Sequence, residues 1–390
     1  MSTPGPRKLA GTTGRATRRT EGADELETVE LFAGIGGFRI AADDIGLKTV
    51  WANDWDADAA TVYESAFGPS CFHQGDLFDL MGEVPAHHIL TAGFPCQPFS
   101  FAGKKKGIAD ERADTFSALI CVLDSLRPPV FVLENVRSIL TIANGRHFKY
   151  LLLELAAVGY DVEWRVVNAV DFGLPQNRKR TLIVGHPTGS DPTGEPALGD
   201  RTEWSRLVDD GHLDEGETAL RSSSFPTWGR TMGREYAGVN APIACGLPPV
   251  PLSKLLENHV DDRYDFTDST LARLARSTPI GEFIDGVEVL WNQEGGRRMG
   301  YTVFGTGGAS PTLTSSTSRH YERYEVGDRY YRRLTPTEYA RLQGFPDGHC
   351  DLVPHGKRYC LIGNAVPPAI AHHGLTAAIK LAARASVLAA

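Results

Sequence analysis

The stretch from Val29 to Phe38 decides the fold and reads Val-Glu-Leu-Phe-Ala-Gly-Ile-Gly-Gly-Phe. Its first residues, Val29–Ala33, are mainly apolar and predict a strand, and the glycines that follow predict a turn that opens a helix. Glycines in such a turn let a ligand approach the backbone, and the N-terminus of the helix offers unpaired N–H groups. The segment therefore indicates an α/β protein with a ligand site where this strand ends.

The alternation of strand and helix continues as far as residue 187. Short runs rich in Val, Ile, Leu, Phe and Trp predict strands at Val29–Ala33, Thr49–Ala52, His88–Ala92, Val130–Leu133, Glu163–Asn168 and Thr181–Gly185. Stretches of helical length and apolar spacing lie between them at Asp56–Ala66, Ala113–Leu126 and Arg146–Val158. Strands that alternate with helices predict an α/β layer built on a parallel sheet.

Length and composition limit the class of protein. The chain has 390 residues, of which 42% are hydrophobic and 23% charged, which is an ordinary globular composition. No apolar run approaches the roughly 20 residues of a membrane helix, and the N-terminus lacks an apolar signal segment. The six cysteines include no C-x-x-C pair, so we expect neither a zinc site nor a disulfide framework. We therefore expect a cytoplasmic protein with no metal and no membrane partner.

Composition also divides the chain into segments. Residues 188–333 are rich in Gly, Pro, Ser and Asp, and their helical signal is confined to Ser253–Val260 and Ser269–Arg276. Helical patterns return at Thr335–Leu342 and from Pro367 onward. We expect a disordered basic tail at 1–24, a ligand-binding α/β domain at 25–187, a second loop-rich domain at 188–333, and a return to the first domain at 334–390.

Charge is distributed unevenly along this acidic chain, whose net charge is −8. Residues 191–290 carry 18 Asp and Glu against 9 Lys and Arg, whereas residues 297–333 carry seven Arg against three acids. A local basic stripe on an acidic chain can bind phosphates. The alternative is that several of these arginines pair with Glu322, Glu325 and Asp328.

A carboxylate and an indole follow the glycine-rich turn at the distance of a nucleotide site. Asp54 lies 18 residues after Gly36, just beyond the second expected strand, where a carboxylate can hold ribose hydroxyls. Trp55 beside it could stack on an adenine. The dinucleotide pattern requires a third glycine at position 39, which here is Arg39. A tight turn without a ligand therefore remains the alternative for this motif alone.

A cysteine with unusual neighbours follows the strand at His88–Ala92. Cys96 stands between Pro95 and Pro98, which stiffen a loop rather than extend a strand. The nearby run of Lys104, Lys105 and Lys106 would lower the pKa of its thiol. The polar stretch that reaches Asp114 has the composition of a mobile lid. A lone cysteine is usually a small core residue, but these surroundings favour a nucleophile.

Two further motifs carry charge at strand ends. Glu134 begins Glu-Asn-Val at the end of an apolar strand, where burial can raise the pKa of a carboxyl group so that it acts as an acid. Arg178 and Arg180 lie two residues apart in Gln-Asn-Arg-Lys-Arg, so they point the same way on an extended segment. Helix or strand capping and an ordinary charged strand edge are the alternatives for each motif alone.

The last two motifs are informative because of the residues they contain and their order in the chain. Residues 333–347 contain Leu-Thr-Pro-Thr-Glu and Leu-Gln-Gly-Phe-Pro, and residues 363–368 read Gly-Asn-Ala-Val-Pro-Pro. All six motifs, in this order, resemble the DNA (cytosine-5)-methyltransferase family of bacterial restriction–modification type. The match runs from about Val29 to Ile370 and is interrupted by the loop-rich segment at 188–310.

The resemblance implies a Rossmann-like S-adenosylmethionine-dependent methyltransferase fold with a smaller, loop-rich target-recognition domain at 188–333. It implies Cys96 as the nucleophile, Glu134 as the partner of cytosine nitrogen 3, and the Arg178 and Arg180 pair as further catalytic groups, with Arg180 on the ring carbonyl. The implied S-adenosylmethionine-binding residues are Phe32, Ala33, Gly34, Ile35, Gly36, Gly37, Asp54, Trp55, Asp76, Leu77, Pro95, Asn364 and Ala365.

The implied partner is double-stranded DNA, bound by a monomer, with a cognate restriction endonuclease acting separately. We expect the DNA contacts to come from Lys104, Lys105, Arg112, Arg297, Arg298, Thr312, Arg319, Arg323 and Arg333. An NAD-dependent oxidoreductase is the alternative from another class of enzyme. It does not explain the motif Pro95-Cys96-Gln97. A regulator without catalysis would not need Cys96, Glu134 and Arg180 together. Methylation of transfer RNA is the third alternative, and the long segment at 188–333 favours DNA over it.

Overall fold

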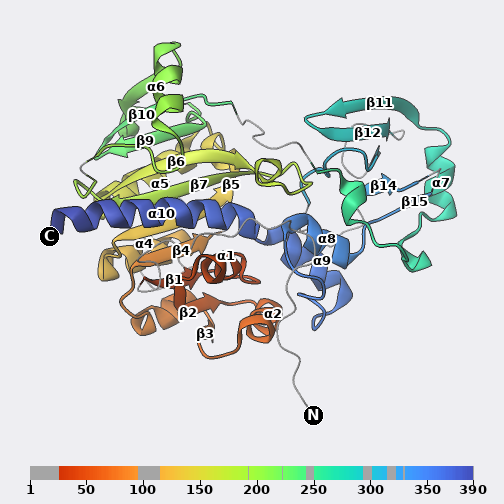
Figure 1. Ribbon diagram of the computed structural model, residues 1–390, viewed down its shortest axis with the longest axis horizontal. Helices are drawn as coiled ribbons and strands as arrows, with labels where there is room; N and C mark the ends of the chain where they lie inside the picture. The colour runs from red at the N-terminus through yellow and green to blue at the C-terminus, as the bar shows by residue number, and fades with distance from the viewer. Residues whose placement is uncertain are drawn as a thin grey trace.

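The computed structural model describes residues 26–94, 115–191, 193–221, 223–242, 250–292, 301–313, 322–327 and 330–389. The described strands form a ten-stranded sheet and a five-stranded sheet. Figure 1 shows the long C-terminal helix α10 (Pro368–Ala389) running along the large sheet, with the small sheet at the opposite end from the C-terminus. None of the helices in the described ranges is long and apolar enough to cross a membrane.

The large sheet has its topological switch at β1. Its strand order is β3-β2-β1-β4-β5-β7-β6-β9-β10-β8. The first five strands in this order are parallel, and the chain moves outward from β1 to β3 before it returns to β4 on the other side of β1. Ligands bind at such a switch point, beyond the carboxyl ends of the strands. The strands are β1 (Glu27–Leu31), β2 (Lys48–Asp54), β3 (Phe72–Gln74), β4 (Ile89–Gly93), β5 (Val130–Val136), β6 (Tyr160–Asn168) and β7 (Lys179–Pro187).

Helices cover both faces of this sheet because its strands alternate two apolar sets of side chains. Val130 and Val132 of β5 pack with α1 (Gly37–Ile45) and α10 on one face. Phe131 and Leu133 pack with α4 (Thr115–Leu126) and α5 (Arg146–Ala157) on the other face. The helix α2 (Ala57–Phe67) and the short α3 (Leu77–Leu80) follow β2 and β3. The predicted α/β fold is confirmed.

The parallel pattern ends at β7, which differs from the all-parallel sheet expected from the sequence. β7 runs antiparallel to both β5 and β6. Residues 169–178 between β6 and β7 hold only one short 3-10 turn, Ala169–Phe172. So short a connection returns the chain beside the strand it has just left, whereas a parallel neighbour needs a crossover of about a dozen or more residues.

The segment after residue 187 first extends the large sheet, which differs from the second domain expected to begin there. α6 (Arg201–Asp209) precedes β8 (Leu213–Glu217), β9 (Trp228–Met232) and β10 (Glu235–Val239), and β9 pairs antiparallel with β6. Gly229 permits this pairing, because a Cβ there would lie 2.2 Å from the Trp164 ring. The buried carboxylate of Glu163 accepts the Trp228 indole N–H at 2.9 Å. Composition alone does not register such contacts.

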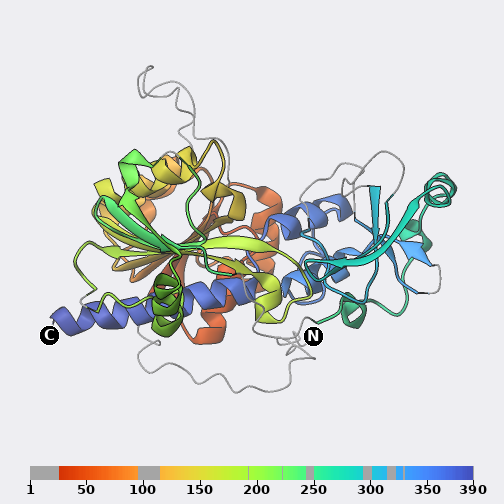
Figure 2. The same ribbon diagram turned by 90° about the horizontal axis from the view of Figure 1, so that it is seen from above.

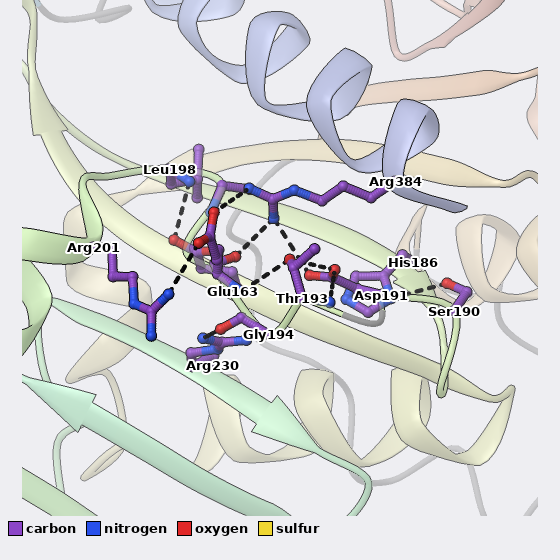
Figure 3. A network of polar contacts seen from close by, with 12 residues as sticks. Glu163, His186, Ser190, Asp191, Thr193, Gly194, Leu198, Arg201, Arg230 and Arg384 are labelled. Atoms are coloured by element: carbon purple, nitrogen blue, oxygen red, sulfur yellow. Dashed lines mark hydrogen bonds and ion pairs between the residues drawn. The ribbon is translucent and has the colours of Figure 1, made fainter. Parts of the chain in front are cut away.

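Figure 3 shows how this extension is fastened to α10. Arg384 of α10 donates to the carbonyl oxygen of Glu195 at 2.8 Å and lies 3.4 Å from the Asp191 carboxylate. Glu163 accepts the backbone N–H groups of Ala197 and Leu198 at 2.6 and 3.0 Å. The stretch between β7 and α6 is thus held by the sheet on one side and by α10 on the other.

The second sheet begins near residue 278, later than the composition indicated. Its strand order is β11-β12-β13-β14-β15. In both views the helices α8 and α9 lie between this sheet and the large one (Figures 1 and 2). The elements are α7 (Asp268–Leu274), β11 (Thr278–Ile284), β12 (Val287–Asn292), β13 (Thr302–Phe304), β14 (Arg323–Glu325), β15 (Tyr331–Arg332), α8 (Pro336–Gln343) and α9 (His355–Asn364).

Local sequence signals predict α8 correctly, but they do not predict the structure at residues 252–260. Thr335 and Glu338 form a reciprocal capping box at the start of α8, with Pro336 as its first residue. The helix expected at Ser253–Val260 is reduced to a 3-10 turn at Leu252–Leu255. There the backbone N–H of Leu252 donates to the carbonyl of Gly308 at 2.8 Å, which ties the turn to a distant segment.

Candidate active site

The candidate site lies where the carboxyl ends of β1, β2, β4 and β5 meet the beginning of β7. Because β7 is antiparallel to β5, Arg180 at its start lies opposite Val136 at the end of β5. Glu134 follows Val132 by two residues and Arg180 precedes Leu182 by two, so both side chains fall on the face covered by α1 and α10. Strand pairing therefore brings together two charged groups that lie 46 residues apart.

Glu134 and Arg180 form a buried ion pair. Arg180 Nε lies 2.8 Å from Glu134 Oε1, and the two residues are 8% and 7% exposed. The N–H is not aimed at this oxygen, so Oε1 has no donor of good hydrogen-bond geometry among the described residues. Burial raises the pKa of Glu134, although Arg180 and Arg178 oppose the shift. The pair thus combines an acid whose pKa is raised by burial with an adjacent cation.

Arg178 uses its donors on the backbone of the chain itself. It is 1% exposed, and its Nη2 donates to the carbonyls of Gly363 and Ala365 at 2.9 and 3.0 Å. Its Nη1 donates to the carbonyl of Leu313 at 3.4 Å. Arg178 therefore holds the end of α9 and the segment at Leu313 beside β7.

The glycine-rich turn is shaped by close backbone contacts. Gly36 has φ 83°, and a Cβ there would lie 2.3 Å from the Phe67 ring. A Cβ at Gly37 would lie 2.0 Å from the carbonyl oxygen of Val366, which brings the C-terminal segment against α1. Gly34 has φ 55°, and a Cβ there would meet no heavy atom within 4 Å among the described residues. The turn thus leaves a space beside the backbone at Gly34.

Polar groups of β2 and β3 border this space. Asp54 is 8% exposed and accepts the backbone N–H of Gly34 at 2.8 Å and that of Asp56 at 3.0 Å. Burial raises the pKa of Asp54. Trp55 beside it is 76% exposed. Asp76 caps α3 by accepting the backbone N–H of Phe78 at 3.0 Å. The arrangement offers a carboxylate, an open indole face and a cradle of backbone.

Comparison with known proteins decides which family the chain belongs to. The model of the C-5 cytosine-specific DNA methylase family matches residues 26–380. The chain belongs to this family. It is therefore a DNA (cytosine-5-)-methyltransferase, and the family uses S-adenosylmethionine as methyl donor. The resemblance seen in the sequence is confirmed, and the oxidoreductase alternative is excluded.

The chain is similar to several type II methyltransferases, two over most of its length and one over part of it. The type II methyltransferase M.NgoBI of Neisseria gonorrhoeae is 31% identical over 347 residues, which cover 87% of this chain and 89% of that protein. M.HpaII of Haemophilus parainfluenzae is 31% identical over 353 residues, covering 89% and 87%. M.HaeII of Haemophilus aegyptius is 46% identical over 162 residues, and the match covers 41% of this chain and half of M.HaeII.

A solved structure shows the same fold at low sequence identity. The DNMT2 mutant of Spodoptera frugiperda matches with a TM-score of 0.61 and 18% identity, covering 91% of this chain and all of that one. This likeness supports the mixed α/β fold with its second, smaller sheet.

Several expected site residues of the methylase lie outside the described residues. They are Pro95, Cys96, Lys104, Lys105, Arg112, Arg297, Arg298 and Arg319. The approach to Cys96 is described as far as Phe94, whose carbonyl accepts the side-chain amide of Asn135 at 3.0 Å. A Cβ at Gly93 would lie 3.8 Å from Glu134 Oε2. The segment that leads to Cys96 therefore starts beside Glu134.

Two of the expected DNA-contacting arginines lie in a cationic part of the second sheet. Burial and the charges of Arg273 and Arg333 lower the pKa of Arg323. Arg333 donates to the carbonyl of Arg263 at 2.8 Å. Thr312 donates its hydroxyl to the carbonyl of Asn177 at 2.6 Å.

Arg332 does not belong to the expected basic stripe. It is 2% exposed and forms a bidentate ion pair with Glu338, with both N–O distances at 2.7 Å. The buried Glu322, one of the acids named as alternative partners of these arginines, accepts the hydroxyl of Tyr339. The capping box of α8 thus takes Arg332 as its counter-ion.

Sequence reasoning gave no role to three polar groups near the site. The side chain of Asn53 donates to the carbonyls of His73 and Gly75 at 2.8 and 3.0 Å, which shapes the turn before Asp76. Asn135 holds Phe94, as described above. Glu30 is buried, accepts the hydroxyl of Tyr63 at 3.0 Å, and has its pKa raised to about 8 by burial. A charged residue inside an apolar strand was the signal that could have drawn attention to Glu30.

Asn364 and Ala365 reach the site from the C-terminal side. Ala365 is 8% exposed and its carbonyl is held by Arg178, while Asn364 is exposed at the end of α9. The chain then turns at Val366, against Gly37 and Gly93, before α10 begins. The last motif thus returns to the carboxyl edge of the large sheet, next to the glycine-rich turn.

Proposed function

We propose that this methylase modifies carbon 5 of a cytosine flipped out of duplex DNA, with Cys96 as nucleophile and Glu134 and Arg180 as the groups that hold the ring. The observation that carries the proposal is the buried Glu134–Arg180 pair beside the start of the segment that bears Cys96. Carbon 6 of a stacked base is inaccessible, so the base must leave the helix before a thiolate can reach it.

Covalent addition makes an unreactive carbon nucleophilic. The Cys96 thiolate forms a bond to carbon 6, and the electron pair of the carbon 5–carbon 6 double bond becomes available at carbon 5. Splitting one difficult step into two easier ones is the general benefit of a covalent nucleophile. After carbon 5 has taken the methyl group, loss of its proton to a base and cleavage of the sulfur–carbon 6 bond restore the aromatic ring and the free thiol.

Glu134 and Arg180 stabilise the charge that this addition creates. Burial raises the pKa of Glu134, and in its protonated form this group donates a hydrogen bond and then the proton to nitrogen 3. Arg180 donates to the ring carbonyl oxygen from the neighbouring position. Both groups are held by packed strands before the base arrives, so little reorganisation is needed when charge develops.

The glycine-rich turn and its borders fit S-adenosylmethionine. The space at Gly34 admits a ligand against the backbone, the carboxylate of Asp54 can accept ribose hydroxyls, and the exposed Trp55 offers a face for adenine. When bound, the cofactor supplies an electrophilic methyl group carried on a positively charged sulfur. The other proposed contacts come from Phe32, Ala33, Ile35, Gly36, Gly37, Asp76, Leu77, Pro95, Asn364 and Ala365.

We place target recognition in the part of residues 188–333 that begins at residue 250, because β8–β10 belong to the large sheet. Arg297, Arg298, Arg319, Arg323 and Arg333 remain the proposed arginine contacts to duplex DNA, and Arg332, which pairs with Glu338, is not one of them. Phosphate contacts supply affinity and base contacts supply specificity. The similarity to type II methyltransferases supports a cognate restriction endonuclease that acts separately on the same DNA sequence.

A mechanism-based substrate tests the proposal directly. Bisulfite sequencing of DNA from cells that express the chain first identifies the target sequence. A duplex with 5-fluorocytosine at the target position should then trap the protein in a denaturant-resistant adduct when S-adenosylmethionine is present, because fluorine cannot leave as a proton does. Cys96→Ala should give no adduct while it still binds DNA and cofactor. A wild-type protein that methylates DNA without forming the adduct would refute the covalent route.

A further inference from the structure

The hairpin formed by β11 and β12 touches the segment that carries Arg178 and Arg180. Its two turn residues, Asp285 and Gly286, have φ of 49° and 78°, as a type I′ hairpin turn requires. The side-chain amide of Asn177 donates to the carbonyl of Asp285 at 3.0 Å. The ammonium of Lys179 lies 3.1 Å from the Asp285 carboxylate. The two residues that alternate with the arginines therefore hold the turn of the second sheet.

Asn177 is engaged on every polar atom. Its Oδ1 accepts the side-chain amide of Asn168, at the end of β6, at 3.0 Å. Its backbone N–H donates to the carbonyl of Ser310 at 2.8 Å, and its carbonyl accepts the hydroxyl of Thr312 at 2.6 Å. One side of Asn177 is thus fixed to the large sheet, and the other side is fixed to the hairpin turn and to residues 310–312.

Lys179 stands between the turn and the buried ion pair. It is the first residue of β7, and its carbonyl accepts Arg180 Nη1 at 2.9 Å. The same guanidinium contacts Glu134 through Nε. A shift of the hairpin turn that moves the backbone at Lys179 therefore reaches the guanidinium of Arg180 through a single hydrogen bond.

We propose that Asn177 and Lys179 are positioning residues that set the placement of the second sheet relative to the Glu134–Arg180 pair. This rests on the proposed function, in which the second sheet reads the duplex and the pair holds the flipped cytosine. DNA bound on the second sheet then presents its base to the pair in a fixed relation. Misplacement of a reacting group by about 1 Å can cost about 100-fold in rate. The contacts of Asn177 and Lys179 with the β11–β12 turn therefore act on kcat rather than on binding.

Exchanging the charges of Lys179 and Asp285 distinguishes a positioning role of this contact from a role in folding. Asp285 is 68% exposed at the side chain, and an ion pair of this exposure contributes little to stability. Lys179→Glu should therefore leave the melting temperature nearly unchanged while kcat falls about tenfold. Adding Asp285→Lys restores an opposite pair, and the double variant should recover most of kcat although Lys is less suited than Asp to a positive φ.

The experiment compares steady-state methylation by wild type, Lys179→Glu, Asp285→Lys, the double variant and Asn177→Ala. Rates are divided by the active fraction, titrated with the 5-fluorocytosine duplex, and the affinities for target duplex and S-adenosylmethionine are measured by calorimetry. Lys48→Asp is the matched charge control, since Lys48 pairs with Glu27 at 2.7 Å at the amino end of the same sheet. Asn240→Ala is the matched control for the amide. Both controls should keep wild-type kcat.

The expected result is a loss of kcat in Lys179→Glu and Asn177→Ala with cofactor affinity unchanged and duplex affinity within about threefold, and recovery in the double variant. A double variant no faster than Lys179→Glu, or an Asn177→Ala variant with wild-type kcat, would overturn the positioning role. That failure is distinct from failure of the proposed function, which would show as absence of the covalent adduct with the wild-type protein. If the wild-type protein forms no adduct, the proposed function and this inference are both wrong.

Discussion

Glu134→Gln tests the buried ion pair with almost no change of shape. The amide keeps the volume of the carboxyl group but cannot carry its acidic proton or its negative charge. Glu134 is 7% exposed and lies 2.8 Å from Arg180, so water does not replace the lost group. Removing one preorganised donor at a developing charge costs about 10²–10³ in kcat, which corresponds to roughly 3–4 kcal/mol. S-adenosylmethionine affinity should change little, because β1 and β2 form its proposed cradle.

The pH dependence supplies a second signature of the same substitution. Burial raises the pKa of Glu134 above its usual value of 4.5, so the folded protein keeps this proton over a pH range where the unfolded chain has lost it. In that range the free energy of unfolding of the wild type falls as pH rises, relative to Glu134→Gln. The wild-type kcat should likewise fall as pH rises through the raised pKa, and Glu134→Gln should lack that limb.

The assay is steady-state transfer of a labelled methyl group to the target duplex, with the active fraction titrated with the 5-fluorocytosine duplex. Glu163→Gln is the control, since Glu163 is also buried but bonds Trp228 and the backbone of residues 197 and 198. It should lower stability and leave kcat per active enzyme unchanged. If Glu134→Gln stays within about threefold of the wild-type kcat, or keeps the alkaline limb, Glu134 is not the proton donor to nitrogen 3.

Five other substitutions test the surrounding structure. Trp55→Ala and Asp54→Ala should each weaken S-adenosylmethionine binding by roughly 1–3 kcal/mol, because a stacking face and a ribose acceptor are lost, and unchanged calorimetric affinity would leave them only structural. Gly37→Ala would press a methyl group into the Val366 carbonyl, 2.0 Å away, so a loss of about 1–3 kcal/mol of stability is expected in denaturant unfolding. Arg332→Met leaves Glu338 buried without its counter-ion and should cost about 3–5 kcal/mol, whereas Arg333→Ala should change the salt dependence of DNA binding more than stability.

Local signals predicted most of the elements around the site. The strand expected at Thr49–Ala52 forms as β2, and the helix expected at Arg146–Val158 forms as α5. α9 was not expected, because its sequence begins with His-Gly-Lys-Arg and follows a run of turn-forming residues. On composition, residues 188–333 were expected to form one separate loop-rich domain, whereas β8–β10 extend the large sheet. The contact that places them, Trp164 against Gly229, joins residues 65 positions apart.

The sequence by itself determined the family, the order of the chemical motifs, and local structures such as the capping box of Thr335 and Glu338. These depend on residues within a few positions of one another, so their spacing can be read directly from the sequence. Only the tertiary structure decided that Arg178 holds carbonyls up to 187 positions away, that Arg332 is a buried counter-ion, and that Asn177 and Lys179 meet the β11–β12 turn. An arginine has the same five donors at every site, and which acceptors it meets depends on strand direction and register, which no short stretch of sequence encodes.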